Sequence, residues 1–200
     1  LIIDNAYGHP FPGVIHNGFQ PKWRPGMIFS ISMSKVGLPG VRTAMIVADA
    51  PIVKALSNMN AIVSLANGNI GQALLLPLLK DDTLIKLGPQ VIRPFYRERS
   101  DFAKSVLAKA LGDKVPWALH KQEGAFFLWL WINGLPVTAK ELYSRLKERK
   151  VLVIPGHYFA FGIENEWRHP HECLRLTYSQ PQNIVREGLE IIAEEVVNLF

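Results

Sequence analysis

The stretch Met27–Ala48, MIFSISMSKVGLPGVRTAMIVA, sets a lysine between two short apolar runs, and these runs decide the fold class. Met27–Ile31 and Ala44–Ala48 show little polar alternation, and neither does Leu1–Ile3 at the start of the chain. Short strands of this kind are typical of a sheet that is covered by helices on both faces. We therefore predict an α/β fold built on a mostly parallel sheet.

Lys35 follows the first of these runs, where desolvation disfavours a charged amine. Two arrangements make it tolerable: a carboxylate partner, or burial that leaves the amine neutral and able to bond to a carbonyl. The flanking residues favour the second, because Ser32 and Ser34 offer hydroxyl donors and Arg42 brings a guanidinium. Such groups, with the backbone of a glycine-containing loop, bind phosphate. A phosphate beside a reactive lysine indicates pyridoxal phosphate.

Asp4 and Tyr7 fit the same prediction. Asp4 ends the first apolar run and Tyr7 follows it in a loop, so we expect both at the carboxyl edge of the sheet, where open α/β folds bind ligands. Pyridoxal phosphate needs a carboxylate beside its pyridine nitrogen and a donor beside its phenolic oxygen. A strand-end aspartate alone is commonly only a loop or helix cap. Asp4 becomes a stronger candidate because the motif from Ser32 to Arg42 follows it in the sequence.

The middle of the chain is predicted to be helical. Apolar periodicity indicates helices at Pro51–Met59 and Gln72–Leu79 and a long one at Gln90–Leu111. We expect two domains. Residues 1–112 would be the C-terminal part of a large cofactor-binding domain, including the long interdomain helix, and residues 113–200 a smaller C-terminal domain.

From about Pro116 the pattern changes to that of an α+β unit. Thr138 and Glu141 form a capping box that opens a helix ending near Lys150, and Pro181 precedes the final helix. We predict that the final helix buries Ile184, Leu189, Ile192, Val196 and Leu199. We predict strands at Phe126–Ile132, Val151–Ile154 and Cys173–Tyr178.

These motifs closely resemble those of the fold-type I, class I and II aminotransferases, and the resemblance spans essentially the whole chain. It implies pyridoxal phosphate as cofactor, a homodimer, and transfer of an amino group from a small apolar amino acid, L-valine, to a 2-oxo acid, pyruvate. The stretches that carry it, in order, are IDNAYGHPFPGVI, SMSKVGLPGVR, NMNAIVSLANGNIG, EGAFFLWLW, LPVTAKELYSRLKERKVLVIPGHYF and CLRLTY.

The resemblance also implies a role for each cofactor residue. Lys35 would bond covalently to the cofactor and move the substrate proton. Asp4 would pair with the pyridine nitrogen and Tyr7 with the phenolic oxygen. Ser32 and Arg42 would hold the phosphate.

Two further roles follow from the resemblance. Ser34 is a weaker candidate for the phosphate. Arg175, on the strand face opposite Leu174 and Leu176, would bind the substrate carboxylate through two parallel N–H donors. By itself, an arginine at such a position is more often simply an exposed strand residue.

The sequence departs from the family pattern in three ways. Arg42 lies seven residues after Lys35, where many members have eight, and Ala44 stands where a glycine is usual. The front half of the family, with its glycine-rich phosphate turn and ring-stacking aromatic residue, has no counterpart here. We expect this chain to be the back part of something longer.

Composition bounds the remaining possibilities. The net charge is +5 and the pI about 9.4, but the basic residues are scattered, so we expect no nucleic-acid partner. No apolar run is long enough for a membrane span, and a single cysteine suits the reducing cytoplasm. The spacing of His169, His171, Glu172 and Cys173 matches no common zinc pattern, so we expect no metal.

Three alternatives to a valine-type aminotransferase remain open at this point. The chain could belong to another pyridoxal phosphate enzyme of the same fold. It could be an aminotransferase-like regulatory domain that binds the cofactor. It could also be an inactive fragment, because the pocket would lack one wall.

Overall fold

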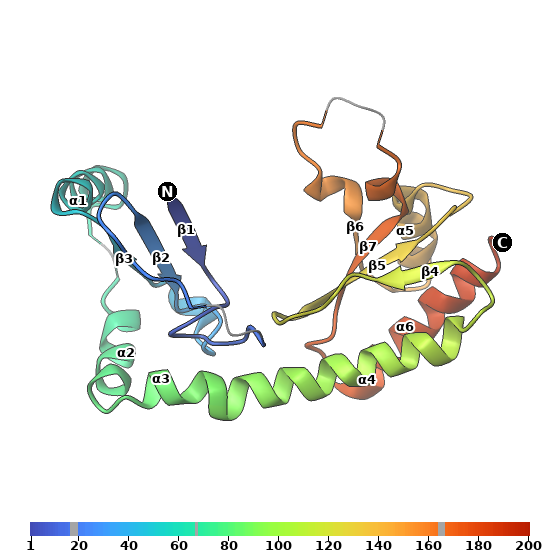
Figure 1. The fold of residues 1–200 in the computed structure, drawn as a ribbon, viewed down its shortest axis with the longest axis horizontal. Helices are drawn as coiled ribbons and strands as arrows, with labels where there is room; N and C mark the ends of the chain where they lie inside the picture. Colours follow the sequence, from blue (N-terminus) through green and yellow to red (C-terminus); the bar gives the residue numbers. More distant parts are fainter. Residues whose placement is uncertain (17–19, 67, 164–166) are drawn as a thin grey trace. The chain divides into compact units, whose positions relative to one another are not determined.

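The computed structural model describes residues 1–16, 20–66, 68–163 and 167–200. The chain divides into two compact units, Leu1–Phe95 and Tyr96–Phe200 (Figure 1). Each unit has a sheet and a hydrophobic core of its own. The alternation of helices and strands confirms the predicted α/β class, whereas the predicted boundary after residue 112 stays a prediction.

The sheet of the first unit has three strands in the order β1-β2-β3. β1 (Ile2–Asn5) pairs in parallel with β2 (Ile28–Ser32), which pairs antiparallel with β3 (Ala44–Val47). All three predicted strands are present, but the direction of β3 departs from the mostly parallel arrangement. The physical reason is the short connection of residues 33–43, because a parallel return needs a crossover of a dozen residues or more.

Helices make up the rest of the first unit. α1 (Ala50–Ser64) begins with Pro51 in its first turn and is followed by α2 (Ile70–Lys80) and the short α3 (Thr83–Leu87). The core contains one residue each from α2 and α3, together with residues of β2 and the two loops beside it. Its buried members are Phe11, Phe29, Ile31, Met33, Val36, Leu75 and Leu84.

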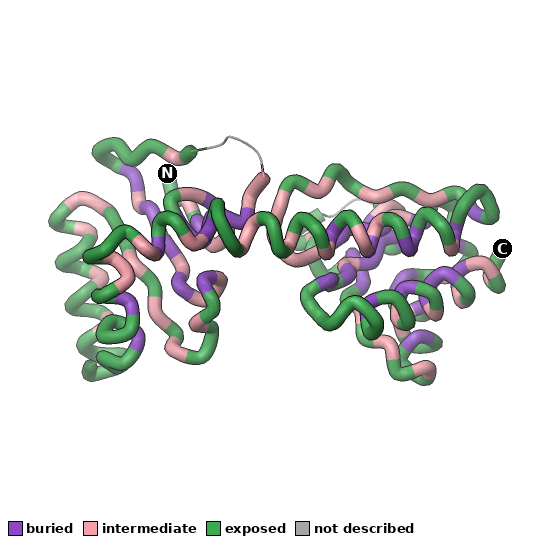
Figure 2. The backbone as a smooth tube through the Cα atoms, turned by 90° about the horizontal axis from the view of Figure 1, so that it is seen from below, coloured by how far each residue is buried: buried purple, intermediate pink, exposed green. Residues whose placement is uncertain are grey.

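Helix α1 is the least buried element of the first unit. None of its residues is buried, and its tube is green and pink in Figure 2. Ile62 and Val63 are 86% and 78% exposed, and Leu65, directly after the helix, is 89% exposed. Apolar side chains at such density on one surface are typical of a face that contacts further protein.

The long predicted helix begins later than expected. A π-helical turn spans Gly88–Ile92, and α4 runs from Arg93 to Leu111. Pro94 lacks the N–H that would donate to the preceding turn, so a regular α-helix over residues 90–94 would lose a hydrogen bond. Gly88 is required there, because a Cβ at this position would overlap the carbonyl oxygen of Pro12.

The sheet of the second unit is antiparallel throughout, in the order β4-β5-β7-β6. Its strands are β4 (Trp117–Leu119), β5 (Phe127–Ile132), β6 (Ile154–Pro155) and β7 (Cys173–Thr177). Three residues are too short a run for β4 to be recognised from sequence. The predicted Val151–Ile154 strand is shorter, because Val151 donates its N–H to Leu146 at the end of a helix instead of to a strand.

Two helices, α5 (Ala139–Glu148) and α6 (Gln182–Val197), pack together in this unit. The buried face of α6 differs from the prediction at two positions. Ile184 is 50% exposed and Val185 is buried instead, and Leu199 follows the end of the helix and is only partly buried. Val185 shares the helical spacing of the other buried residues Leu189, Ile192 and Val196. In the described residues, no helix is long and apolar enough to cross a membrane.

The predicted capping hydrogen bond at the start of α5 is confirmed, and its contribution to stability can be measured. Thr138 Oγ1 accepts a hydrogen bond from the Glu141 N–H at 3.2 Å. We predict that Thr138→Ala lowers the free energy of unfolding by about 1 kcal/mol, because that donor loses its acceptor. Ser144→Ala is the matched control, since it removes an exposed hydroxyl within the same helix. Equal urea midpoints for the two variants would contradict the capping role.

Candidate active site

Lys35 lies in the turn after β2, between two buried apolar side chains. Met33 is fully buried and Val36 is 8% exposed, so the backbone on either side of the lysine is anchored in the core of the first unit. Lys35 itself is half-buried, and its Nζ lies 5.6 Å from the centre of the Tyr7 ring. The structure thus brings together two of the predicted cofactor residues.

Asp4 lies on β1, directly opposite Ser30 of β2. The Ser30 hydroxyl donates to Asp4 Oδ1 at 3.0 Å, which orients an otherwise exposed carboxylate. Sequence reasoning missed Ser30, because no local pattern shows which residue of a neighbouring parallel strand lies across from an aspartate. Only the register makes it a partner of Asp4.

The loop that carries Tyr7 is fixed by polar contacts. Tyr7 accepts a backbone hydrogen bond from Val14 at 2.8 Å. Asn5 is buried, and its Nδ2 donates to the carbonyl of His9 at 2.7 Å. These bonds close the loop on itself at the carboxyl end of β1, so the Tyr7 ring projects from an ordered segment.

The predicted phosphate donors form a connected set in the turn after β2. Arg42 Nη1 donates to Ser34 Oγ and to the carbonyl of Pro39, each at 3.1 Å. The Ser34 N–H donates to Ser32 Oγ at 3.3 Å. Arg42 has left-handed backbone angles, φ 47° and ψ 45°, a conformation that costs of the order of 1–3 kcal/mol in a non-glycine residue. Such strain is common in functional turns, and here it accompanies a cluster of anion donors.

Arg175 belongs to the second unit, at the centre of its sheet. It lies on β7 opposite Trp129 of β5 and Ile154 of β6. Its guanidinium carbon lies 4.3 Å from the centre of the Phe127 ring and 4.8 Å from that of Phe159. Leu174 and Leu176 are buried on the opposite face, as the alternation along the strand predicts.

Comparison with known proteins identifies the family. The family model described as aminotransferase class I and II matches residues 1–192. This chain belongs to the class I and II aminotransferases. Pyridoxal phosphate is the cofactor of this family, and the turn after β2 suits such a group chemically because it combines an amine, a guanidinium and two hydroxyls.

Individual aminotransferases resemble the chain over its whole length. It is 44% identical to the valine–pyruvate aminotransferase of Escherichia coli strain K12, over 98% of this chain and 47% of that protein. A putative amino-acid aminotransferase of Psychrobacter arcticum superposes with a TM-score of 0.97 at 42% identity, over 100% of this chain and 46% of that one. The valine–pyruvate aminotransferase of Salmonella typhimurium LT2 superposes with a TM-score of 0.93 at 43% identity, over 98% and 50%. The chain therefore spans about half the length of these relatives.

The histidine-rich segment before β7 has a structural explanation. The buried carboxylate of Glu172 accepts hydrogen bonds from Trp131 Nε1 at 2.9 Å and from the Gly134 N–H at 3.2 Å, and it pairs with Arg168 Nε at 2.6 Å. Burial lowers the pKa of His169 and raises the pKa of the Cys173 thiol to about 11. Within the described ranges, no group of three or more acidic, histidine or cysteine side chains is arranged to hold a metal.

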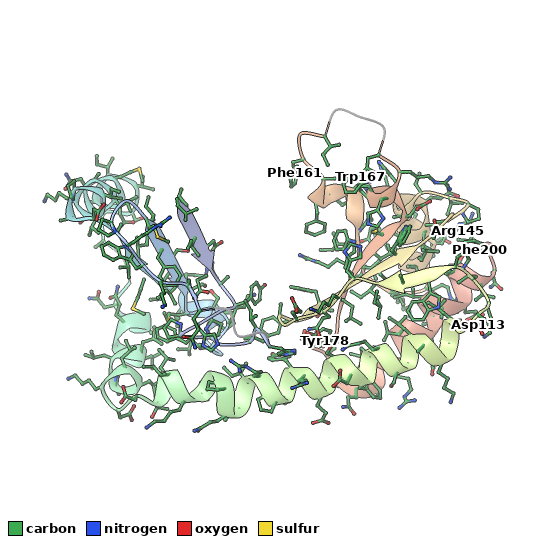
Figure 3. All side chains as sticks on the ribbon, in the orientation of Figure 1. Asp113, Arg145, Phe161, Trp167, Tyr178 and Phe200 are labelled. Atoms are coloured by element: carbon green, nitrogen blue, oxygen red, sulfur yellow. The ribbon has the colours of Figure 1, made fainter. Side chains whose placement is uncertain are left out.

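Tyr178 is a second residue whose role sequence reasoning missed. Its hydroxyl donates to the carbonyl of Ala125 at 2.7 Å and contacts Gln122 Nε2 at 2.6 Å, and the side chain is labelled in Figure 3. Gln122 Oε1 accepts from the buried Ser100 hydroxyl of α4 at 3.0 Å. This network ties the β4–β5 loop to the end of β7 and to α4, and burial raises the pKa of Tyr178 far above its usual range.

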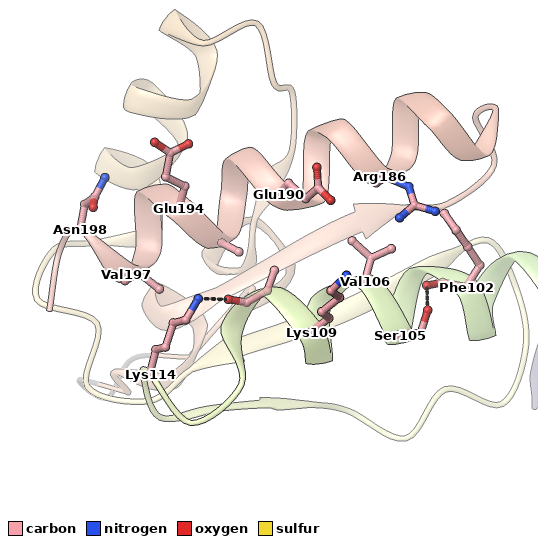
Figure 4. Close-up of a pocket in the computed structure, with 12 residues that line it drawn as sticks. Phe102, Ser105, Val106, Lys109, Lys114, Arg186, Glu190, Glu194, Val197 and Asn198 are labelled. Atoms are coloured by element: carbon pink, nitrogen blue, oxygen red, sulfur yellow. Dashed lines mark hydrogen bonds between the residues drawn. The ribbon is translucent and has the colours of Figure 1, made fainter.

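The groove shown in Figure 4 lies between α4 and α6 and has a volume of about 440 Å³. Arg186 lies over the Phe102 ring on one side of it, with 5.0 Å from the guanidinium carbon to the ring centre. Lys114 Nζ donates to the carbonyl of Ala110 at 3.0 Å. None of the predicted site residues lines this groove, so it is separate from the cofactor residues.

The buried carboxylate of Glu172 offers a test of the scaffold beneath β7. We predict that Glu172→Ala lowers the free energy of unfolding by about 1–3 kcal/mol, because the half-buried indole N–H of Trp131 loses its acceptor. Urea unfolding followed by tryptophan fluorescence measures this. Glu148→Ala, at an exposed position on α5, is the control and should change stability by less than about 0.5 kcal/mol. A loss no larger than the control's would refute the assigned role.

Proposed function

We propose that this chain supplies the cofactor lysine, the phosphate donors and the carboxylate-binding arginine of a pyridoxal phosphate-dependent aminotransferase. The reaction proposed is transfer of the amino group of L-valine to pyruvate, giving 3-methyl-2-oxobutanoate and L-alanine. The observation that carries this proposal is the arrangement of Lys35 beside the Tyr7 ring, followed by the Ser34–Arg42 pair in the same turn. The similarity to valine–pyruvate aminotransferases of two bacteria supports the choice of substrates.

The residues of the first unit fit the cofactor chemically. The Arg42 guanidinium and the hydroxyls of Ser32 and Ser34 are donors for a phosphate dianion. Asp4 is a carboxylate for a protonated pyridine nitrogen, and the Tyr7 hydroxyl is a donor for the phenolic oxygen. Pyridoxal phosphate, when bound, would supply the electron-withdrawing ring that makes the α-proton of an amino acid removable.

Lys35 has two tasks in this proposal. Its amine would hold the cofactor between turnovers. With substrate bound, the same amine would act as general base on the α-proton of the amino acid and return that proton as general acid. The anchoring of Met33 and Val36 in the core favours both tasks, because it keeps the lysine backbone in one place while the side chain moves.

Asp4 and Arg175 stabilise charge in the same reaction. Asp4 keeps the proton on the pyridine nitrogen, and the hydrogen bond from Ser30 orients its carboxylate for this task. Arg175 binds the α-carboxylate of the amino acid, and then of the 2-oxo acid, as a bidentate pair. The same residues serve both half-reactions because donor and acceptor share the carboxylate and the adjacent carbon.

The proposal extends to the whole enzyme. We propose a cytoplasmic homodimer in which residues 1–112 belong to the large cofactor-binding domain and residues 113–200 form the small domain. The exposed apolar side chains of Ile62, Val63 and Leu65 support a further protein surface against α1. Ultracentrifugation of the full-length enzyme tests the dimer.

An absorbance titration tests the proposed cofactor site. We predict that the chain, with pyridoxal phosphate in excess, develops the visible band of the lysine-bound cofactor at about 420 nm, and that L-valine converts it to a band at about 330 nm. Lys35→Ala should abolish the visible band, whereas Lys54→Ala, an exposed lysine on α1, should keep it. We expect weak binding and slow turnover, because the chain spans about half the length of its relatives.

The outcomes separate the proposal from its alternatives. A band that survives in Lys35→Ala would refute the assignment of the lysine. A Lys35-dependent band that no amino acid converts would favour a regulatory cofactor-binding domain. Conversion by amino acids other than L-valine would indicate another enzyme of the same fold. No band in any variant would mean that these residues do not form a working site by themselves.

A further inference from the structure

The guanidinium of Arg175 lies over two aromatic rings. Phe127 contacts it from β5, and Phe159 contacts it from the 3-10 turn Gly156–Phe159 that follows β6. Both rings are within cation–π distance, and each attracts the positive charge through its face. A ring face attracts the charge without using the N–H donors of the guanidinium, so these donors stay available to another partner.

Strand register explains how the first ring reaches Arg175. Trp129 lies directly opposite Arg175 in the antiparallel pair, and Phe127 lies opposite Thr177. Phe127 is therefore a diagonal neighbour of Arg175 on the same face of the sheet, at a separation that aromatic side chains span. The position of this ring follows from the β5–β7 register.

The second ring is brought back over the same face by a turn that requires glycine. β6 pairs with β7 on its other side, with Ile154 opposite Arg175, and the chain then turns at Gly156. A Cβ at Gly156 would lie 2.7 Å from both Cys173 Cβ and the carbonyl oxygen of Pro170. The absence of a side chain lets the turn lie against β7, and Phe159 is held edge-on by Trp129, with ring centres 5.3 Å apart.

Arg175 differs from other arginines of its unit in what balances its charge. Arg149 pairs with Glu194 at 2.6 Å and Glu195 at 3.5 Å, and Arg168 pairs with Glu172. In the part of the chain that the structure describes, Arg175 forms no ion pair with a carboxylate. Rings hold a guanidinium without neutralising it, so its charge and its N–H edge stay accessible to a carboxylate from outside.

We propose that Phe127 and Phe159 are positioning residues for Arg175: together they hold the guanidinium plane so that its free edge receives a carboxylate. The inference builds on the proposed function in taking that carboxylate to be the substrate's. It adds that the affinity of this subsite depends on two ring faces, both of which belong to the second unit.

A carboxylate titration of the full 200-residue chain tests this clamp without the cofactor. The probe is 3-methylbutanoate, which has the carbon skeleton and carboxylate of valine but no amine. The readout is the Nε–Hε NMR signal of Arg175, identified by its loss in Arg175→Lys. We expect a saturable shift in the unchanged chain, weakened about fivefold in Phe127→Leu and in Phe159→Leu, since each loses a ring contact of about 1 kcal/mol.

Conservative variants separate a ring effect from simple damage to the fold. Phe159→Tyr keeps a ring face and should bind 3-methylbutanoate as the unchanged chain does. Phe161→Leu, at a side chain that is 85% exposed, is the matched control and should also bind normally. Equal affinities in the two leucine clamp variants and the unchanged chain would overturn the proposal, as would equal weakening in Phe159→Tyr and Phe159→Leu, or no saturable shift at all.

The design keeps this inference separate from the proposed function. The titration contains no pyridoxal phosphate and reads only a signal of the second unit, so a missing cofactor band leaves its result intact. Loss of the clamp effect, with a Lys35-dependent band still present, would refute only the role of the two phenylalanines.

Discussion

The parallel pairing of β1 with β2 is the constraint on which the candidate cofactor site depends. Because the two strands run in the same direction, with Asp4 opposite Ser30, their carboxyl ends meet at one edge of the sheet. The loop after β1 carries Tyr7 and the turn after β2 carries Lys35, so both follow the same edge. A slip of one residue would turn the Asp4 side chain to the other face and remove its contact with Ser30.

In the second unit, the candidate binding residue Arg175 is a cation that contacts aromatic rings. Arg149 pairs with carboxylates and so connects α5 to α6, and Arg168 pairs with Glu172. Arg175 is instead held by ring faces, and the buried Glu172 fixes the segment that leads into its strand through Trp131 and Gly134. Arg149 and Arg168 are thus neutralised by carboxylates, whereas Arg175 lies over aromatic rings.

Much of the fold could be predicted from local patterns. The three strands of the first unit, the capping box at Thr138 and the alternation along β7 each depend on a few adjacent residues, and the structure contains them all. The direction of β3, the pairing of only Ile154–Pro155 in β6 and the burial of Val185 instead of Ile184 were not predicted. Each of these depends on which partner a segment meets, and that partner is distant in sequence.

The candidate site divides in the same way. The sequence by itself determined the types and order of its chemical groups, because a lysine, its serines and an arginine within one turn carry a recognisable phosphate and amine chemistry. Only the tertiary structure decided that Ser30 donates to Asp4 and that Phe127 and Phe159 lie against Arg175. Strand register and a close turn at Gly156 create those contacts, and neither is encoded in the spacing of neighbouring residues.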